Sequence, residues 1–236
     1  TAPGAYGNDT LDYSRNTIRE SIRESSKRLG VDYFDIVHVH DIEYQHRKHT
    51  EWALNEGLSA VHELKRDGLV GNVSFGIYPL ELWQRILNEF SIDAMLVHNH
   101  YCLSDTRALE LLPLANKRGI GVINASPFAS GLLTGREAAD WHPANSDQRT
   151  YFRLASQWCA EQGTSIAKIA LQFASQNLEI PTTMFSSANP ESVARNCSWH
   201  EDPVDLELVT GVKKILEPVR DVQWDYDVSS TRSKFK

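Results

Sequence analysis

The fold is decided by residues 33–77, which read YFDIVHVH at 33–40 and VSFGI at 73–77, with a helical pattern between them. Both outer runs are rich in β-branched and aromatic residues, as buried strands are. Between them apolar residues recur at helical spacing from Leu54 to Leu64, and Gly68 ends that helix. A strand, a helix and a second strand in this order form a βαβ unit, which predicts a parallel sheet.

The alternation of helices and strands continues on both sides of this unit. Asn189 and Pro190 are typical of a helix start, because asparagine caps a helix and proline suits its first position. Further strands are predicted at 94–100, 120–124 and 180–185. Helices are predicted at 14–30, 79–87, 109–119, 148–162, 165–177, from 190 onward and at 204–217.

Right-handed crossovers leave two arrangements for such a chain, an open doubly wound sheet or a (β/α) barrel. The glycines Gly119 and Gly121 precede a strand and have no third glycine, so the dinucleotide signature of the open sheet is absent. Histidines and serines at strand ends favour the barrel, whose chemistry lies at the C-terminal rim. We therefore expect an α/β fold of the (β/α)8 TIM-barrel type, incomplete, with about five of the eight strands present.

The expected domain organisation is one partial barrel and a short tail. The barrel-like domain is expected over 1–228, and 229–236 is expected to be a disordered basic tail. The chain begins with Thr1 rather than Met, and about three βα units are expected upstream of it. Because an open sheet exposes its edges, we expect the chain alone to aggregate, to form a homodimer through an edge, or to bind a hydrophobic dye.

Composition excludes several classes of protein. The 236 residues carry 24 basic and 31 acidic side chains, a net charge of 24 − 31 = −7, which argues against nucleic acid as a partner. No apolar run is long enough for a membrane span, and the first residues do not resemble a signal peptide. The three cysteines are far apart and form neither a disulfide framework nor a zinc pattern. We expect a cytoplasmic protein with a small-molecule partner.

Two histidine pairs provide the clearest chemical pattern. His38 and His40 end the first predicted strand and are followed by Asp41, while His98 and His100 end the third. Residues i and i+2 of a strand share a face, so each pair is expected to face the barrel lumen. Two pairs at strand ends favour a site over core histidines that bond each other. Imidazole also suits zinc, but the other strand ends offer no carboxylates, so no metal is predicted.

Two loops suggest a ligand that carries phosphate. Residues 126–135 are rich in glycine and serine, so a ligand could approach the backbone closely, although an ordinary loop has the same composition. Asn189 begins a helix after the fifth strand, and helix N-termini favour anions. In barrels, phosphate sites commonly form at the last two strands.

The chain resembles the aldo-keto reductase family, most closely its branch of L-galactose dehydrogenase and aldose 1-dehydrogenases. The likeness runs from about residue 1 to Trp224 and is carried by the motifs at 29–43, at 124–134 and at 141–144. It implies an eight-stranded barrel with a nicotinamide dinucleotide extended over the rim. It also implies a catalytic tyrosine assisted by a lysine, an aspartate and a histidine, and that histidine is His40.

The resemblance also assigns the other site residues. His98 would hold the nicotinamide amide, and Asp41, Trp141 and His142 would contact the substrate. The remaining cofactor contacts implied are Ser126, Phe128 and Ser130 at the pyrophosphate, and Ser187, Asn189 and Asn196 at the adenosine. The implied activity is oxidation of an aldose, such as an L-galactose-like sugar, at C1. The expected cofactor is NAD rather than NADP, because Ser186 and Ser192 stand where NADP-dependent members have cations.

Three departures from the family pattern accompany the resemblance. The family's catalytic tyrosine and aspartate lie before the first residue here, and Ala2 occupies the place of the catalytic lysine. The Ser-Asn motif after the second strand is replaced by Ile77-Tyr78-Pro79. The alternatives are therefore a catalytically inactive homologue with a binding role and, from another class, a metal-dependent barrel hydrolase.

Overall fold

The computed structural model describes residues 11–224 of the chain, and the predicted tail at 229–236 lies outside them. Five strands form one sheet in chain order, and β1 pairs with β2, and β4 with β5, in parallel. The predicted number of strands and the α/β barrel-type alternation are confirmed. The strands are β1 (Phe34–His40), β2 (Val70–Ile77), β3 (Ala94–His98), β4 (Gly121–Ala125) and β5 (Thr182–Met184).

The chain divides into two compact units. Within the described residues, unit one comprises 11–96 and 118–121, and unit two comprises 97–117 and 122–224. No helix within residues 11–224 is both long enough and apolar enough to cross a lipid bilayer.

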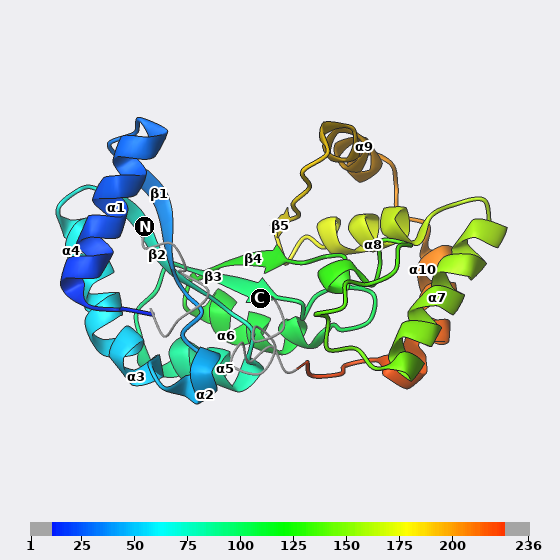
Figure 1. The fold of residues 1–236 in the computed structure, drawn as a ribbon, viewed down its shortest axis with the longest axis horizontal. Helices are drawn as coiled ribbons and strands as arrows, with labels where there is room; N and C mark the ends of the chain where they lie inside the picture. The colour runs from blue at the N-terminus through cyan, green and yellow to red at the C-terminus, as the bar shows by residue number, and fades with distance from the viewer. Residues whose placement is uncertain (1–10, 225–236) are drawn as a thin grey trace. The chain divides into compact units, whose positions relative to one another are not determined.

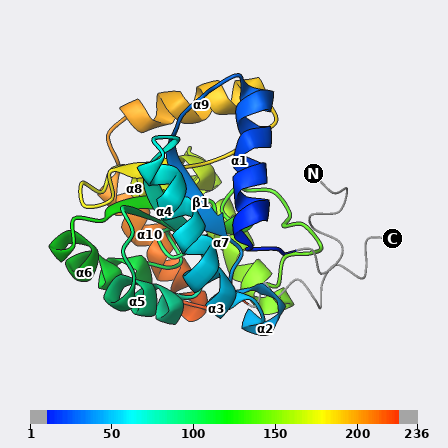
Figure 2. The ribbon, with the colours of Figure 1, turned by 90° about the vertical axis from the view of Figure 1, so that its left-hand side faces the viewer.

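Unit one is built from β1, β2 and the helices that cover them. The helices are α1 (Arg15–Leu29), α2 (Tyr44–Arg47), α3 (Thr50–Trp52), η1 (Ala53–Gly57), α4 (Leu58–Arg66) and α5 (Leu80–Glu89). Helix α1 begins where the Ser14 side chain accepts the N–H of Thr17, and it ends at Gly30, which has a φ of 69°. Helix α4 packs on β2, and α1 lies beside α4 (Figures 1 and 2).

The core of unit one lies around β2. Val73, Phe75 and Ile77 are buried. Trp83 of α5 is also fully buried and is one of the largest side chains in the core. The Trp83 indole N–H donates to the carbonyl of Ile77 at 3.2 Å, so its one polar atom is satisfied. Complete burial of such side chains on one strand fixes the register of its neighbour.

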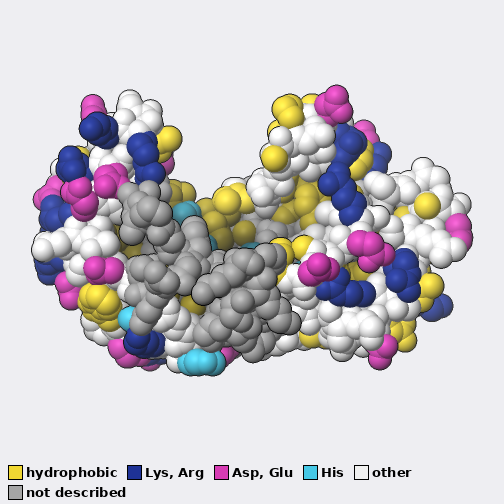
Figure 3. All heavy atoms as spheres, viewed as in Figure 1, with side chains coloured by type: hydrophobic (Ala, Val, Ile, Leu, Met, Phe, Trp, Pro, Cys, Tyr) yellow, Lys and Arg dark blue, Asp and Glu magenta, His cyan; other side chains and the backbone are white. Residues whose placement is uncertain are grey.

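Helix α1 contrasts with this core, because none of its residues is buried. Arg15 and Arg19 form ion pairs with Glu63 of α4, and Arg19 also pairs with Asp67. Figure 3 shows basic and acidic side chains intermixed over these two helices. Surface ion pairs contribute at most about 1 kcal/mol each, so these pairs add only modestly to the stability of α1.

Unit two contains the later helices. They are η2 (Arg107–Leu111), α6 (Leu112–Lys117), η3 (Ala129–Gly131), α7 (Ser146–Glu161), α8 (Ile166–Ser175), α9 (Pro190–Glu201), α10 (Leu206–Leu216) and η4 (Glu217–Val219). Helix α10 packs against α7 at Gly211, where a Cβ would overlap the Trp158 ring. The absence of a side chain at Gly211 therefore permits this close approach.

The third strand is shorter than the predicted 94–100, and this corrects one expectation. Strand β3 ends at His98, and Asn99 has a φ of 60°, in the left-handed region. The chain therefore turns between the two histidines, and alternation along a strand no longer relates them. His98 and His100 consequently do not share one face of a strand as the sequence predicted.

The sheet order places β1 and β5 at its two ends in the described part of the chain. Ile36 of β1 is 38% exposed and Met184 of β5 is 46% exposed. We predict that the chain binds a hydrophobic dye and self-associates through these strands, and that Ile36→Lys reduces both effects. Light scattering and dye fluorescence provide the measurement, with Leu109→Lys, at an exposed position outside the sheet, as the control. A monomeric wild-type chain that binds no dye and melts cooperatively would contradict this prediction.

Candidate active site

At the end of β1, His40 and Asp41 form a fixed pair. The His40 Nδ1 lies 2.6 Å from the Asp41 Oδ1, and the His40 side chain is 59% exposed. Because a carboxylate only accepts, Nδ1 carries the proton, and Nε2 is the acceptor of the neutral ring. The hydrogen bond to Asp41 raises the pKa of His40 above 6.5, although desolvation opposes it. The pair therefore presents an exposed, oriented imidazole.

The neighbouring strand supplies the space for this ring. The parallel register places His40 opposite Gly76 of β2, and a Cβ at Gly76 would lie 2.5 Å from the His40 Cδ2. Any other residue at this position would displace the ring. The buried Tyr13 hydroxyl donates to the His40 carbonyl at 2.8 Å. Tyr13 thus holds the backbone of His40, and the His40 ring lies against Gly76.

His38 has a different partner from His40. Its Nδ1 lies 2.9 Å from the Ser74 Oγ, and the Ser74 hydroxyl itself donates to the Phe75 carbonyl. His38 therefore donates to Ser74. Burial, together with the nearby His40, lowers the pKa of His38 below 6.5. The two imidazoles share a strand face, but their pKa values are shifted in opposite directions.

Glu43 is a site candidate that the reasoning from residue patterns did not single out. Its Oε1 accepts the N–H of Tyr78 at 2.8 Å, which ties the segment after β1 to the end of β2. Its Oε2 is buried and has no hydrogen-bond partner within the described residues. Burial raises the pKa of Glu43 to about 7, while the N–H of Tyr78 opposes this rise. Near neutral pH this carboxyl therefore carries a proton part of the time.

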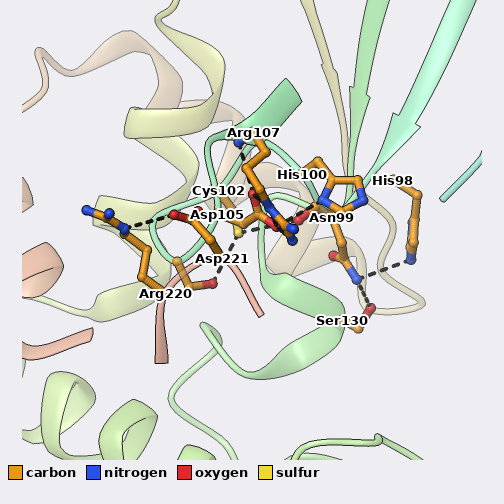
Figure 4. A network of polar contacts seen from close by, with 10 residues as sticks. His98, Asn99, His100, Cys102, Asp105, Arg107, Ser130, Arg220 and Asp221 are labelled. Carbon is orange, nitrogen blue, oxygen red and sulfur yellow. Dashed lines mark hydrogen bonds and ion pairs between the residues drawn. The ribbon is translucent and has the colours of Figure 1, made fainter. Parts of the chain in front are cut away.

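In unit two, hydrogen bonds join three of the predicted cofactor residues, His98, Ser126 and Ser130, and Figure 4 shows His98 and Ser130 on either side of Asn99. The Asn99 amide donates to the Ser130 Oγ at 2.7 Å and to the His98 Nε2 at 3.2 Å. His98 is therefore neutral, with its proton on Nδ1, which lies 3.0 Å from the Ser126 Oγ. Asn99, which no motif singled out, connects His98 with Ser130.

A pocket of about 330 Å³ lies at the ends of β4 and β5 in unit two. The rings of Phe128 and Phe185 meet edge to face, with centroids 6.4 Å apart. Its hydroxyl-bearing lining includes Ser126, Ser130 and Ser186. The structure therefore brings the predicted residues Ser126, Phe128 and Ser130 together around one cavity of a size typical for small ligands.

The backbone of this loop is less available to an anion than its composition suggests. The N–H groups of Ala129, Gly131, Leu132, Leu133 and Thr134 donate to carbonyls within the turn. Binding of an anion at this loop therefore depends more on hydroxyl groups than on the cradle of backbone N–H groups that we expected.

Helix α9 contains the predicted adenosine contacts. The Asn189 side chain caps it as predicted and accepts the N–H groups of Glu191 and Ser192 at 2.8 and 3.3 Å. The Ser187 hydroxyl accepts the Asn189 N–H at 3.1 Å, and Asn196 is buried two turns along the helix. The cap already satisfies two N–H groups at the start of α9. A ligand here would therefore bind mainly to side chains rather than to backbone N–H groups.

Trp141 and His142 have different environments, although both were predicted to contact substrate. Trp141 is 46% exposed, whereas His142 is 3% exposed and its Nδ1 accepts the N–H of Ala144 at 3.0 Å. Burial and the charge of Arg149 lower the pKa of His142 to about 4. His142 packs edge to face on Trp224. His142 thus has a structural role in this loop, and Trp141 is the more accessible of the two.

His100, expected at a strand end, belongs instead to a buried ion network (Figure 4). Its Nδ1 lies 2.9 Å from the Asp105 Oδ2, and Arg107 donates to the same carboxylate at 2.7 Å. The Asp221 N–H donates to the Ser104 carbonyl at 2.8 Å, which ties the segment after η4 to this loop. The network supports the loop after β3 and explains why His100 is buried.

Three strands are followed directly by a residue in the left-handed region. Asp41 follows β1 with a φ of 60°, Asn99 follows β3 with 60°, and Ser126 follows β4 with 64°. Such a conformation costs about 1–3 kcal/mol outside glycine and is characteristic of functional sites. Each of the three carries one of the hydrogen bonds described above, to His40 or His98. The strained turns therefore orient the two histidines.

Within residues 11–224 no group of three or more histidine, cysteine, aspartate or glutamate side chains is arranged to hold a metal ion. His38 and His40 instead contact Ser74 and Asp41.

Comparison with known proteins places the chain in a family. The aldo/keto reductase family profile matches residues 6–217. L-galactose dehydrogenase of Arabidopsis thaliana is 33% identical over 95% of this chain and 71% of its own length. Pyridoxal 4-dehydrogenase of Microbacterium luteolum is 27% identical over 87% of the chain and 63% of its own length. D-threo-aldose 1-dehydrogenase of a Pseudomonas species is 26% identical over 89% of the chain and 63% of its own length. The chain thus spans less than two thirds of the latter two relatives.

A solved structure shows the same fold. The holo form of an aldo-keto reductase from Bacillus halodurans matches with a TM-score of 0.64 and 22% identity, over 87% of this chain and 69% of that one. The unclosed five-stranded sheet fits part of such a barrel. The chain belongs to the aldo/keto reductase family.

Proposed function

We propose that this chain is an NAD-dependent oxidoreductase of the aldo/keto reductase family that oxidises an aldose, such as an L-galactose-like sugar, at C1. The proposal extends to any longer protein that contains the chain. The observation that carries it is the exposed His40 imidazole, fixed by Asp41 and by the space over Gly76. The aldose and L-galactose dehydrogenases among the relatives support the substrate class.

The residues of unit two fit a nicotinamide dinucleotide. Ser126, Ser130 and Ser186 provide hydroxyl donors around one pocket, and Phe128 and Phe185 provide apolar surface. A dinucleotide held by these residues would supply the hydride acceptor for the carbon that is oxidised. Asn189 and Asn196 of α9 would hold the adenosine end, and His98, fixed by Ser126 and Asn99, would contact the carboxamide.

His40 would orient the sugar. Its neutral ring presents Nε2 as an acceptor, so it can accept the proton of the reacting hydroxyl in a hydrogen bond. The bond to Asp41 prevents the other tautomer, in which Nε2 would donate. The orientation of this hydrogen bond is thus fixed before substrate arrives.

A binding role without catalysis is the second candidate, and one observation favours it. Tyr78 stands where the family has a polar motif, but it is buried and its N–H is used by Glu43. That position therefore offers a carboxamide no exposed polar side chain. A homologue of this kind would bind dinucleotide or sugar without turnover.

One experiment separates the two candidates. Calorimetric titration with NAD measures binding, and absorbance of the reduced cofactor in the presence of L-galactose measures turnover. Binding with turnover supports the oxidoreductase, and binding without turnover supports the second candidate. If neither NAD nor the sugar binds, the proposal is wrong.

We predict that NAD binds at least about tenfold more tightly than NADP, a difference of about 1.4 kcal/mol. Ser186 and Ser192 bring no charge to a 2′-phosphate, and Glu191 at the start of α9 would repel it. A cation close to this position is Arg195, whose guanidinium lies 5.1 Å from the Trp199 ring and 3.2 Å from the Ser192 Oγ.

Titration of wild type and Arg195→Ala with both cofactors checks this preference. Arg195→Ala should leave NAD affinity unchanged, and Lys214→Ala on α10 controls for the loss of one charge. Tighter binding of NADP to wild type, abolished by Arg195→Ala, would show that Arg195 recognises the phosphate.

A further inference from the structure

Unit two contains a second pocket of about 330 Å³, lined by the residues that follow the β4 loop and by one face of α7. Three arginines line it: Arg136 from the loop, and Arg149 and Arg153 from the helix. This pocket shares no lining residue with the pocket at the ends of β4 and β5. It is therefore a separate cavity in the same unit.

The charge of this arginine pocket is not balanced by the protein. Within residues 11–224 none of the three arginines forms an ion pair with a carboxylate, and the only acidic lining residue is Glu137. The lining charge is thus 3 − 1 = +2. Cations that converge on a cavity without acidic partners attract anions from solution.

Hydrogen bonds to the backbone fix the Arg149 guanidinium at this pocket. The Arg149 guanidinium donates to four carbonyls, those of Ala138, Ala139, His142 and Ala144, at 2.9–3.2 Å. Arg149 therefore cannot turn away from its neighbours. Arg153 lies four residues further along α7, a spacing at which like charges face each other and destabilise a helix. An anion bound between them would remove this repulsion.

The rest of the lining indicates the kind of anion. Leu132, Phe152 and Ala160 provide apolar surface, and Ser156 and Gln157 provide neutral polar groups. A phosphate monoester carries about −1.5 to −2 charges near neutral pH, which matches the lining charge, and its organic part suits the apolar wall. Because the Arg149 guanidinium donates to four carbonyls, Arg149 contributes mainly its charge, and the guanidinium N–H groups of Arg136 and Arg153 are those that match phosphate oxygens. We propose that this arginine pocket binds small organic phosphates at a site distinct from the dinucleotide pocket.

Phenyl phosphate is the probe, measured by calorimetry on the whole chain, with phenol and inorganic phosphate as the partial ligands. We expect phenyl phosphate to bind more tightly than either, and Arg153→Glu to weaken it at least about tenfold. Without ligand, Arg153→Glu should raise Tm, because it converts a repulsive pair with Arg149 into an attractive one. A gain in unliganded stability with a loss of binding distinguishes a ligand site from a merely structural cluster.

Lys214→Glu on α10 is the matched control, because it makes the same change of charge in the same unit and does not line the pocket. It should leave phenyl phosphate affinity unchanged. Benzoate, a monoanion of similar shape, should bind more weakly than phenyl phosphate. The proposal is overturned if wild type does not bind phenyl phosphate, if Lys214→Glu weakens binding as much as Arg153→Glu, or if NAD displaces the probe.

Discussion

Replacing Asp105 by asparagine is expected to lower the free energy of unfolding by about 3 kcal/mol, because it removes a buried negative charge that pairs with the Arg107 guanidinium and accepts a hydrogen bond from His100. Asp105 accepts from the Arg107 guanidinium at 2.7 Å, and its other oxygen accepts the backbone N–H of Arg107 at 2.9 Å. His100 is buried on the same carboxylate. The side-chain amide of an asparagine would place an NH2 group, which only donates, against the N–H donors of Arg107 or His100. A loss of this size corresponds to a decrease in Tm of roughly 6–12 °C for a chain of this length.

The pH dependence gives this prediction a second test. Burial opposes ionisation of Asp105, but the hydrogen bonds from His100 and Arg107 outweigh it, so its pKa lies below the ordinary 3.8. A lowered folded-state pKa stabilises the fold above the unfolded value, and this contribution is lost as the pH falls below 3.8 through the folded value. The difference between wild type and Asp105→Asn should therefore shrink in acid.

Denaturant titrations across this pH range, with Glu110→Gln as a control, provide the measurement. Glu110 is an exposed carboxylate on η2, the 3-10 helix that follows Asp105, so its loss should change stability little. Equal stability of Asp105→Asn and wild type at neutral pH would show that the network contributes nothing.

Local sequence patterns predicted the parts of this molecule that depend on neighbouring residues. The β-branched run at 33–40 predicted β1, with His40 at its end and Asp41 directly after it. Asn189 and Pro190 predicted the start of α9 in the same way. In each case the contact spans at most a few residues, so residue type and spacing determine it.

Contacts that depend on register or on an unusual φ could not be predicted in this way. Gly76 matters because the pairing of β1 with β2 places it under His40, and neither strand alone contains that information. Asn99 adopts a left-handed φ that ends β3 early, so the alternation rule failed for His100. Glu43 became notable only through burial of its Oε2, which depends on tertiary packing.

His40→Ala should lower kcat/KM by about 10²-fold to 10⁴-fold in the protein that performs the proposed reaction, the range that one positioned acid–base group supplies. The His40 side chain is mostly exposed, so its removal should cost little stability. Dinucleotide affinity should remain nearly unchanged. Equal losses of dinucleotide binding and of kcat/KM would identify His40 as structural.

Two further variants test how His40 is held. Gly76→Ala should reproduce the kinetic defect, because its Cβ would meet the His40 ring, and the double variant should be no worse than His40→Ala alone. Since Asp41 raises the pKa of His40 and the neutral ring is the acceptor, oxidation should increase as the pH rises through a value above 6.5. Asp41→Asn should move that increase to lower pH. A pH profile unchanged by Asp41→Asn would mean that His40 does not act through Nε2 in its neutral form.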